Sequence, residues 1–453
     1  MEAELLQNLE PRFSYSTVQI NYRKVIIDRR KVKSEARQFE SLKIWESFKN
    51  ILPWYFEVST NHMPAKYLIA KRIPCNLDLS SASEEDLWSE NSLLTQAFLD
   101  MWGKIREREI SILPPKAKGP SLMDLSVELA NRMLAHCNFC RWNCKVDRSK
   151  GTKHGTCQLE STSKIGSYFH HRGEELIFRG TIGSGTIFFT SCNMRCSFCQ
   201  NGDISTDKDN GIPISPSALA LMAWQLRMEG CHNVNWVGGE PTIHLHTILG
   251  AINLLDSFTT PDPRQLEYIQ SVKSDGSHFK SWHINSEHAL YQGQFNCPQL
   301  WNSNFFMSQE AMNILRNIID VWLPDFKFGP GKCALDISRT PWYWETITSN
   351  LKLVHEWGEN IVIRHLIMPN HIECCTKPVL DWIANNIPQV PVNIMDQYHP
   401  DNLCNPETSK YRERYMDISR TCSQEEIARS YKYAKELGLN FEPLSYEKSI
   451  FGF

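Results

Sequence analysis

From about residue 185 onward, the spacing of apolar residues switches between two patterns, one typical of strands and one typical of helices. Short apolar runs, typical of buried parallel strands, are each followed by a segment with apolar residues at helical spacing. The apolar runs cover residues 185–190, 233–237, 300–306, 321–327, 361–369 and 391–399. The helical segments cover residues 215–230, 244–255, a stretch that begins at 308, 343–357 and 379–387. Alternating strands and helices predict a parallel sheet in an α/β chain, and six units predict a partial (β/α)6 barrel.

The same pattern divides the 453 residues into four parts. Residues 1–130 form an N-terminal α+β accessory region, with strands expected at 17–22 and 23–27 and a helix from 85 to 102. Residues 131–180 form a small cysteine-rich module. The barrel spans residues 181–400, with a polar insertion at about 259–297. Residues 401–453 form a helical flank, in which Ser423 and Glu426 have the spacing of a capping box.

Composition places the chain among ordinary globular proteins, with 42% hydrophobic and 22% charged residues. A net charge of −3 argues against a large nucleic-acid-binding face. The sequence has no apolar stretch of the ~18 residues that a membrane span needs, and its first residues lack the pattern of a signal peptide. Fifteen cysteines in such a chain predict a reducing, cytoplasmic location and metal ligation rather than disulfides.

The strongest chemical signal is a set of three cysteines, Cys192, Cys196 and Cys199, directly after the strand at 185–190. Three thiolates on one loop can hold three irons of a 4Fe–4S cube, whereas most such cubes take four. The fourth iron would then stay open to a substrate or cofactor, which indicates a catalytic cluster more than one that only stores electrons. A zinc knuckle or a loop of free cysteines is the structural alternative. It does not explain the Gly-Gly-Glu-Pro motif at 238–241, at the end of the next strand.

A second cysteine cluster lies upstream, with the spacing C-x2-C-x3-C-x12-C. Its members are Cys137, Cys140, Cys144 and Cys157. Four soft ligands within 21 residues fit either a closed zinc site or an auxiliary iron–sulfur cluster. The alternative is four free thiols that bind no metal. Cys374 and Cys375 fall near the expected barrel mouth, where free thiols compete with a redox or ligand role. The remaining cysteines show no ligand spacing: Cys75, Cys231, Cys297, Cys333, Cys404 and Cys422.

The order of strand, cysteine loop, helix, strand and Gly-Gly-Glu-Pro resembles the radical S-adenosylmethionine (radical SAM) superfamily. Within it, the chain resembles the subgroup similar to pyruvate formate-lyase activating enzymes. Residues 181–201, 301–304, 323–327, 364–369 and 395–400 carry this resemblance, and the upstream cysteine cluster and residues 173–175 and 180–181 also belong to the subgroup's pattern. It covers roughly residues 131–445. The N-terminal 130 residues lie outside it and set the chain apart from activating enzymes, whose cysteine loop usually lies near their start.

The resemblance implies an enzyme that reductively cleaves S-adenosylmethionine on a 4Fe–4S cluster. The resulting 5′-deoxyadenosyl radical would abstract hydrogen from a substrate, and the activase-like subgroup points to a protein or peptide. A small molecule or RNA is the alternative substrate, and a non-catalytic metal protein with a structural or regulatory role is the alternative class. A flavodoxin or ferredoxin would supply the electron.

The resemblance also implies roles for polar residues at the strand ends. Gly238 and Gly239 would let the backbone approach the cofactor ammonium, and Glu240 would accept a hydrogen bond from it. Asn302 and Asn304 would bond the cofactor carboxylate or ribose. Further residues expected at the cofactor are Asp325 with Lys327, which could instead form an internal salt bridge, Arg364 as a carboxylate partner, and His399 near the adenosine. His365, next to Arg364, would face outward and be structural.

Overall fold

The computed structural model describes residues 48–180, 182–257 and 289–445. The strands expected at 17–22 and 23–27 lie outside these described residues, as does most of the polar insertion. The remainder of that insertion contains a short hairpin of two strands, β5 (Leu290–Tyr291) and β6 (Gln294–Phe295).

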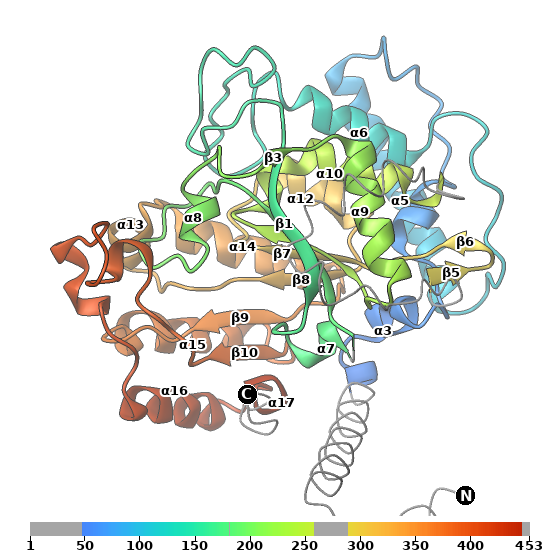
Figure 1. Ribbon diagram of the computed structural model, residues 1–453. Coiled ribbons are helices and arrows are strands. Elements are labelled where there is room, and N and C mark those ends of the chain that lie inside the picture. Colours follow the sequence, from blue (N-terminus) through green and yellow to red (C-terminus); the bar gives the residue numbers. More distant parts are fainter. Residues whose placement is uncertain (1–47, 181, 258–288, 446–453) are drawn as a thin grey trace, which may run out of the picture.

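A curved parallel sheet forms the centre of the molecule (Figure 1). Its strands match the six predicted apolar runs: β2 (Ser184–Phe189), β4 (Val234–Gly238), β7 (Gln299–Ser303), β8 (Val321–Pro324), β9 (Ile363–Leu366) and β10 (Val392–Met395). β2, β4, β7 and β8 are parallel neighbours, and β9 pairs with β10 in parallel. Two isolated parallel bridges, Trp322 to Ile361 and Asp325 to Arg364, continue the order from β8 to β9. The predicted α/β class with a partial parallel barrel is therefore confirmed.

Helices follow the strands as the periodicity predicts. They are α9 (Pro216–Met228), α10 (Leu245–Leu254), α12 (Gln309–Arg316), α14 (Tyr343–Glu356) and α15 (Lys377–Asn386). The hydroxyl oxygens of Ser215 and Ser308 cap α9 and α12 by accepting hydrogen bonds from Ala218 N and Ala311 N. Each cap fixes where its helix begins, and so the length of the loop between that helix and the preceding strand.

Two strands of the sheet and several short helices were not predicted. β1 (Lys164–His171) runs antiparallel to β2, and β3 (Ile212–Pro213) pairs antiparallel with β1. Buried and more exposed positions mix along β1, so its sequence lacks the continuous apolar run of a central strand. The short elements are α7 (Leu176–Arg179), α8 (Gly202–Ser205), α13 (Cys333–Ser338) and α17 (Glu442–Ser445).

The described N-terminal residues share one apolar core with the barrel. They form α3 (Pro53–Ser59), α4 (Lys66–Ala70), α5 (Glu84–Arg106), which was predicted at 85–102, and α6 (Leu122–Arg132). The buried carboxylate of Asp320 joins the two parts, because it accepts hydrogen bonds from Trp54 Nε1 (2.9 Å), Lys66 N (3.0 Å) and Gln299 N (2.8 Å). Three donors on one carboxylate hold α3 and α4 against the start of β7.

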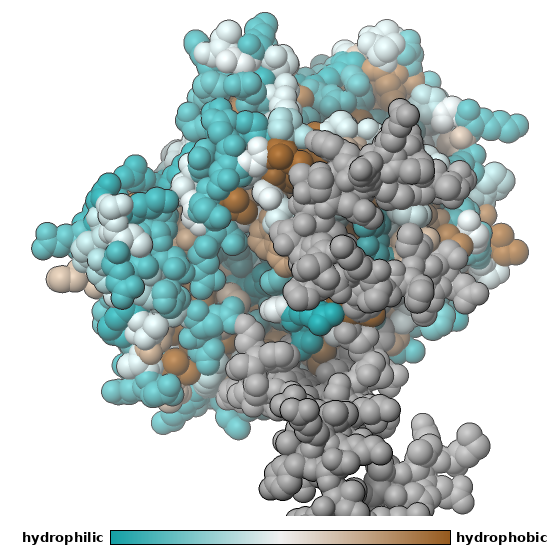
Figure 2. Space-filling view, viewed as in Figure 1, coloured by the Kyte–Doolittle hydropathy of each residue, from teal (hydrophilic) through white to brown (hydrophobic). Residues whose placement is uncertain are grey.

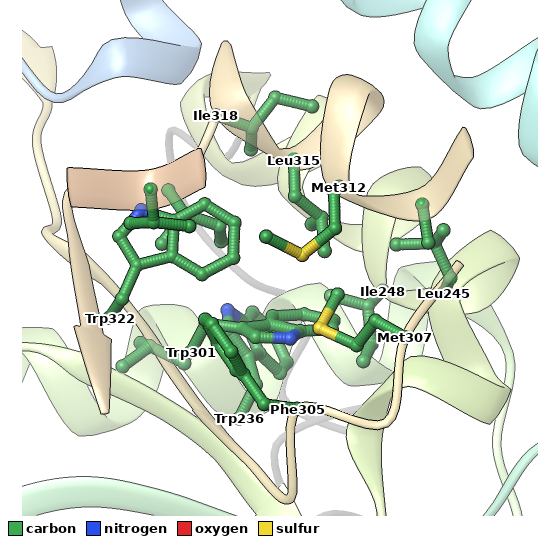
Figure 3. Close-up of a cluster of buried hydrophobic side chains, with 14 of the residues drawn as sticks. Trp236, Leu245, Ile248, Trp301, Phe305, Met307, Met312, Leu315, Ile318 and Trp322 are labelled. Atoms are coloured by element: carbon green, nitrogen blue, oxygen red, sulfur yellow. The ribbon is translucent and has the colours of Figure 1, made fainter. Parts of the chain in front are cut away.

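Three tryptophans form the centre of the core beneath the sheet (Figure 3). Trp236, Trp301 and Trp322 are register partners across the neighbouring strands β4, β7 and β8, and all three are fully buried. Apolar side chains of α10 and α12, including Ile248 and Met312, pack around them. Large buried rings in one row resist a shift of one strand against the next, because such a shift would turn each ring to the other face. The carboxyl ends of these strands are thereby held level.

Among the described residues, no helix is both long and apolar enough to span a membrane. The described surface seen in Figure 2 is mainly hydrophilic, with small hydrophobic areas that lie apart from one another. The main apolar cluster among the described residues is the buried core.

The predicted capping box begins helix α16 (Gln424–Glu436). Ser423 Oγ accepts a hydrogen bond from Glu426 N (3.2 Å), and Glu426 Oε2 accepts one from Ser423 N (2.7 Å). Arg420 also donates to both carboxylate oxygens of Glu426, at 2.8 and 3.0 Å. The hydrogen bonds from Arg420 are the main cause that lowers the pKa of Glu426 to about 2.

Replacing Glu426 with Gln should lower the melting temperature by a few degrees at neutral pH, because Gln keeps a capping partner but loses the charge that Arg420 binds. The carboxyl has a folded pKa near 2 against an ordinary value of 4.5. Its contribution is therefore complete above about pH 4.5 and is lost as the pH falls towards 2. Thermal unfolding of both proteins across this range should show the difference shrinking. Glu425→Gln, in the same turn, is the control; a pH-independent difference for Glu426→Gln would contradict the expectation.

Candidate active site

A cavity of about 390 Å³ lies at the carboxyl ends of the parallel strands. It brings together the three cysteines of the loop and most of the polar residues predicted at the strand ends. These lining residues are Cys192, Cys196, Cys199, Gly238, Gly239, Glu240, Asn302, Asn304, Asp325, Lys327 and Arg364. His399 is not among the lining residues: its Nδ1 lies 3.2 Å from Asp401 Oδ1, and its side chain is exposed. His365 is buried behind the strand, bonded to Phe326 O and Thr376 Oγ1, as a structural residue would be.

Backbone hydrogen bonds from distant segments hold the cysteine loop in place. Arg195 N donates to Ser338 O (3.0 Å) and Ser197 N donates to Ile337 O (2.9 Å), so the end of α13 supports one side of the loop. Leu403 N donates to Ser197 O at 2.8 Å. On the other side, Trp142 Nε1 donates to Asn193 O at 2.7 Å. The loop is therefore braced by three separate parts of the chain.

The three thiols of this loop are suited to a metal cluster. Burial raises the pKa of Cys192 and of Cys199, and it raises the pKa of Cys196 to about 12. Thiols buried in this way become thiolates when a metal replaces the proton. Two N–H groups already point at Cys192 Sγ, from Met194 N (3.3 Å) and Asn304 Nδ2 (3.6 Å). Three thiols facing one cavity, with donors to a sulfur, fit a 4Fe–4S cluster with one iron open.

The two glycines at the end of β4, Gly238 and Gly239, are required by the chain's own backbone. A Cβ on Gly238 would lie 2.1 Å from Phe189 N, and a Cβ on Gly239 would lie 1.6 Å from Ser191 O. Gly238 also has a φ of +123°, which favours glycine. The end of β4 thus packs directly against the residues that lead into the cysteine loop. This explains the glycines without a ligand, and their contact with a cofactor stays a prediction.

Glu240 is fully buried and joins the end of β4 to the end of β7. Its Oε1 accepts hydrogen bonds from Thr242 N (3.1 Å), Thr242 Oγ1 (2.5 Å) and Ser303 Oγ (2.7 Å). Its Oε2 accepts one from Asn304 N at 2.9 Å. Because a carboxylate oxygen can accept two hydrogen bonds, Oε2 keeps the capacity for a ligand donor in the cavity.

Two glutamates that the sequence did not single out as site residues complete the wall of the cavity. Glu175 binds the guanidinium of Arg364 through Nε (2.8 Å) and Nη2 (2.5 Å), and Glu174 binds it through Nη2. Asn393 Nδ2 donates to Glu175 Oε1 (2.7 Å), and Asn235 Nδ2 donates to Glu174 Oε2 (2.6 Å). Arg364 is therefore engaged by the protein itself. The sequence signal that could have identified them as site residues is their occurrence as an adjacent acidic pair directly before α7.

Asp325 and Lys327 form a salt bridge inside the cavity, with 2.5 Å between Oδ2 and Nζ. Burial opposes the charge of Lys327, but the Asp325 carboxylate, with Tyr343 and Cys196, raises the pKa of the ammonium above its usual value. The ammonium therefore stays charged close to the cysteine loop. The sequence left two interpretations of this pair open, an internal salt bridge and contact with a cofactor. The salt bridge is present, and contact with a cofactor stays a prediction.

The four upstream cysteines lie near one another, next to the cysteine loop. Burial raises the pKa of Cys140, and the neighbouring charges of Cys157 and Cys137 add to the effect. A Cβ on Gly155 would lie 2.8 Å from Cys144 Sγ, so the chain folds tightly over this thiol. Ser191 Oγ donates a hydrogen bond to Cys157 O, which connects the two cysteine clusters. Zinc or an auxiliary iron–sulfur cluster in this module stays a prediction.

The sequence model of the radical SAM superfamily matches residues 186–285, which contain the three cysteines and the Gly-Gly-Glu-Pro motif. The chain belongs to the radical SAM superfamily. This radical SAM protein is also 32% identical over 393 residues to the uncharacterized protein MJ0674 of Methanocaldococcus jannaschii, covering 85% of this chain and 97% of that one. The superfamily makes it an enzyme of the radical SAM class and implies a 4Fe–4S cluster and S-adenosylmethionine.

Two solved structures illustrate more distant similarity. Streptococcus suis SuiB bound to S-adenosylmethionine is 14% identical with a TM-score of 0.36, over 56% of this chain and 48% of SuiB. A domain of a pyruvate-formate lyase-activating enzyme from Bacteroides vulgatus is 16% identical with a TM-score of 0.25, over 32% of this chain and 80% of that domain. The aligned part thus spans about half the length of SuiB.

Replacing Gly239 with Ala should destabilise the protein by about 1–3 kcal/mol and reduce iron incorporation, because the new Cβ would displace Ser191 and the loop that follows. The measurements are the midpoint of denaturant unfolding and the iron content after anaerobic reconstitution. Gly331→Ala is the matched control, since a Cβ there meets no atom within 4 Å. Equal iron contents in the two variants would show that the close contact does not set the loop.

Replacing Asn304 with Ala should make the reduction potential of the cluster more negative. The amide N–H that faces Cys192 Sγ stabilises negative charge on the sulfur, which increases on reduction. A net hydrogen-bond contribution of about 1 kcal/mol corresponds to a shift of about 40 mV for a one-electron couple. Redox titration followed by EPR measures it without added cofactor. Asn302→Ala, from the same wall of the cavity, should leave the potential close to wild type; a similar shift in both variants would contradict the role of Asn304.

Proposed function

We propose that this radical SAM protein abstracts hydrogen from a peptide or protein segment. The observation that carries the proposal is the meeting of three thiols and a set of charged and amide side chains in one cavity. When bound, a 4Fe–4S cluster with S-adenosylmethionine at its open iron supplies one-electron cleavage of the cofactor and the hydrogen-abstracting species. The protein's own residues bind, orient and enclose these groups.

Charge in the cavity supports a cationic cofactor. Glu174 and Glu175 carry two negative charges against one positive charge on Arg364, so this group has a formal charge of −1. Asp325 and Lys327 cancel each other. A sulfonium ligand brings positive charge into this buried wall, where opposite charges interact strongly. In this proposal Arg364 positions the two glutamates, and Asn302, whose Oδ1 lies 3.3 Å from Arg364 Nη1, orients the guanidinium.

The size of the cavity supports a substrate that enters only in part. A volume of about 390 Å³ is at the lower end of the range for small-molecule sites, so the cofactor would fill much of it. A single residue of a peptide could occupy the remaining space while the rest of the chain stays outside. This fits the resemblance to the activating-enzyme subgroup. A compact small molecule is the competing substrate, and the net charge of −3 argues against RNA.

The reaction can be tested without knowing the substrate. Anaerobically reconstituted and reduced protein should convert S-adenosylmethionine to 5′-deoxyadenosine, and the EPR signal of its cluster should change when the cofactor is added. Cys196→Ala should lose the cluster and at least a thousandfold of this activity, because the radical chemistry resides in the cofactor. Cys422→Ala, a cysteine outside the cavity, is the control. Unimpaired cleavage by Cys196→Ala would overturn the assignment of the loop.

The substrate class needs a separate measurement. Extract from deuterated cells, divided by ultrafiltration, should transfer deuterium into 5′-deoxyadenosine from the retained protein fraction. Digestion with a protease should abolish or redistribute that transfer. Transfer from the small-molecule filtrate alone would contradict a peptide or protein substrate while leaving the radical reaction intact.

A further inference from the structure

A third set of soft metal ligands lies outside the cavity, at the end of helix α13 opposite to the residues that contact the cysteine loop. Its members are Cys333, His371, Cys374 and Cys375, and one ligand atom from each lies within 4.8 Å of all the others. Cys333 is 41 residues from Cys374 in the chain, and it had no ligand spacing in the sequence. The fold alone brings the four residues together.

The distances between the ligand atoms match a single metal ion. Cys333 Sγ lies 3.6 Å from Cys374 Sγ and 3.5 Å from His371 Nδ1, and His371 Nδ1 lies 3.2 Å from Cys374 Sγ and 4.0 Å from Cys375 Sγ. With metal–ligand bonds of about 2.3 Å to sulfur and about 2.1 Å to nitrogen, a zinc tetrahedron has edges of about 3.6–3.8 Å. One ion could therefore reach all four atoms with small side-chain movements.

The backbone is shaped to place two adjacent cysteines on one side. His371 precedes a π-helical turn, η5 (Ile372–Thr376), in which Thr376 N donates to His371 O at 3.2 Å. π-turns are rare and often occur at functional sites. The loop before α13 approaches this turn closely, because a Cβ on Gly329 would lie 2.0 Å from Cys374 O. Any larger residue at 329 would separate Cys333 from its partners.

A carboxylate behind the histidine completes the arrangement. His371 Nε2 lies 3.2 Å from Asp417 Oδ2, which orients the ring so that Nδ1 faces the sulfurs. Metal-bound histidines commonly have such a partner for their second nitrogen. His371 and Cys375 are buried, whereas Cys374 lies at the surface and leaves a path for an ion.

We propose that Cys333, His371, Cys374 and Cys375 bind one zinc ion in a closed tetrahedral site. Three sulfurs and one imidazole are the ligands of structural zinc centres, and four protein ligands leave no open position for catalysis. The site is separate from the three-cysteine loop and from the four-cysteine module.

The zinc site would act on the cysteine loop through α13. Cys333 is the first residue of this six-residue helix, and Ile337 and Ser338 near its other end accept the hydrogen bonds from Ser197 N and Arg195 N. A fixed α13 therefore holds two amides of the loop that carries Cys196. The role is structural, and it does not depend on the substrate of the enzyme.

Zinc content tests the proposal directly. Protein purified anaerobically should lose about one equivalent of zinc per chain when Cys333 or Cys374 is replaced by Ser, as measured by mass spectrometry of the metals. Cys422→Ser is the matched control and should keep it. Cys140→Ser, in the four-cysteine module, identifies any zinc held there and should leave the new site filled. Equal zinc in all four variants would overturn the proposal, as would a loss of iron in place of zinc.

A rescue variant separates ligation from folding. His371→Cys offers a fourth thiolate and should retain zinc, whereas His371→Ala should lose it. Cobalt(II) in the wild-type site should give the strong visible absorption of a tetrahedral thiolate centre, and Cys333→Ser should weaken it. A disulfide between Cys333 and Cys374 in the purified protein, with no zinc bound, would contradict the site. Loss of zinc should also speed the loss of iron from the reconstituted cluster.

Discussion

The loop that carries Cys192, Cys196 and Cys199 has no regular secondary structure, so the positions of its thiols depend on contacts with other parts of the chain. The end of α13, the residues around Leu403 and the four-cysteine module each hold part of its backbone. Unpaired backbone groups are costly when buried, so these contacts are needed for stability as well as for geometry. The surrounding elements can be understood as the frame for this loop.

The sheet also supports the cysteine loop and the cavity beside it. The row of buried tryptophans on β4, β7 and β8 keeps the ends of these strands level, and Glu240 ties the ends of β4 and β7 together. Polar side chains from successive strands then meet above the core in one cavity. Burial there makes each charge depend on a partner, which is why Arg364 is held by two glutamates and Lys327 by Asp325.

Local patterns in the sequence were enough to predict the parallel strands, their helices and the cysteine loop, because each produces a periodic or closely spaced signal. β1 was missed because a strand of mixed burial gives no continuous apolar run. Glu174 and Glu175 were missed as site residues because their partners, Arg364 and Asn393, lie about 190 and 218 residues away. The group around Cys333 and His371 was missed for the same reason: only the folded chain brings its ligands together.

The glycine pair at 238 and 239 has a wider meaning. Its lack of side chains is demanded by the backbone of Phe189 and Ser191, that is, by the way a strand meets the cysteine loop. A change of substrate would not relieve this demand. The pair therefore indicates a shared architecture and is uninformative about the reaction that a given chain catalyses. Chains built on this frame are better sorted into reaction classes by the residues at the open side of the cavity, where packing leaves sequence free to vary.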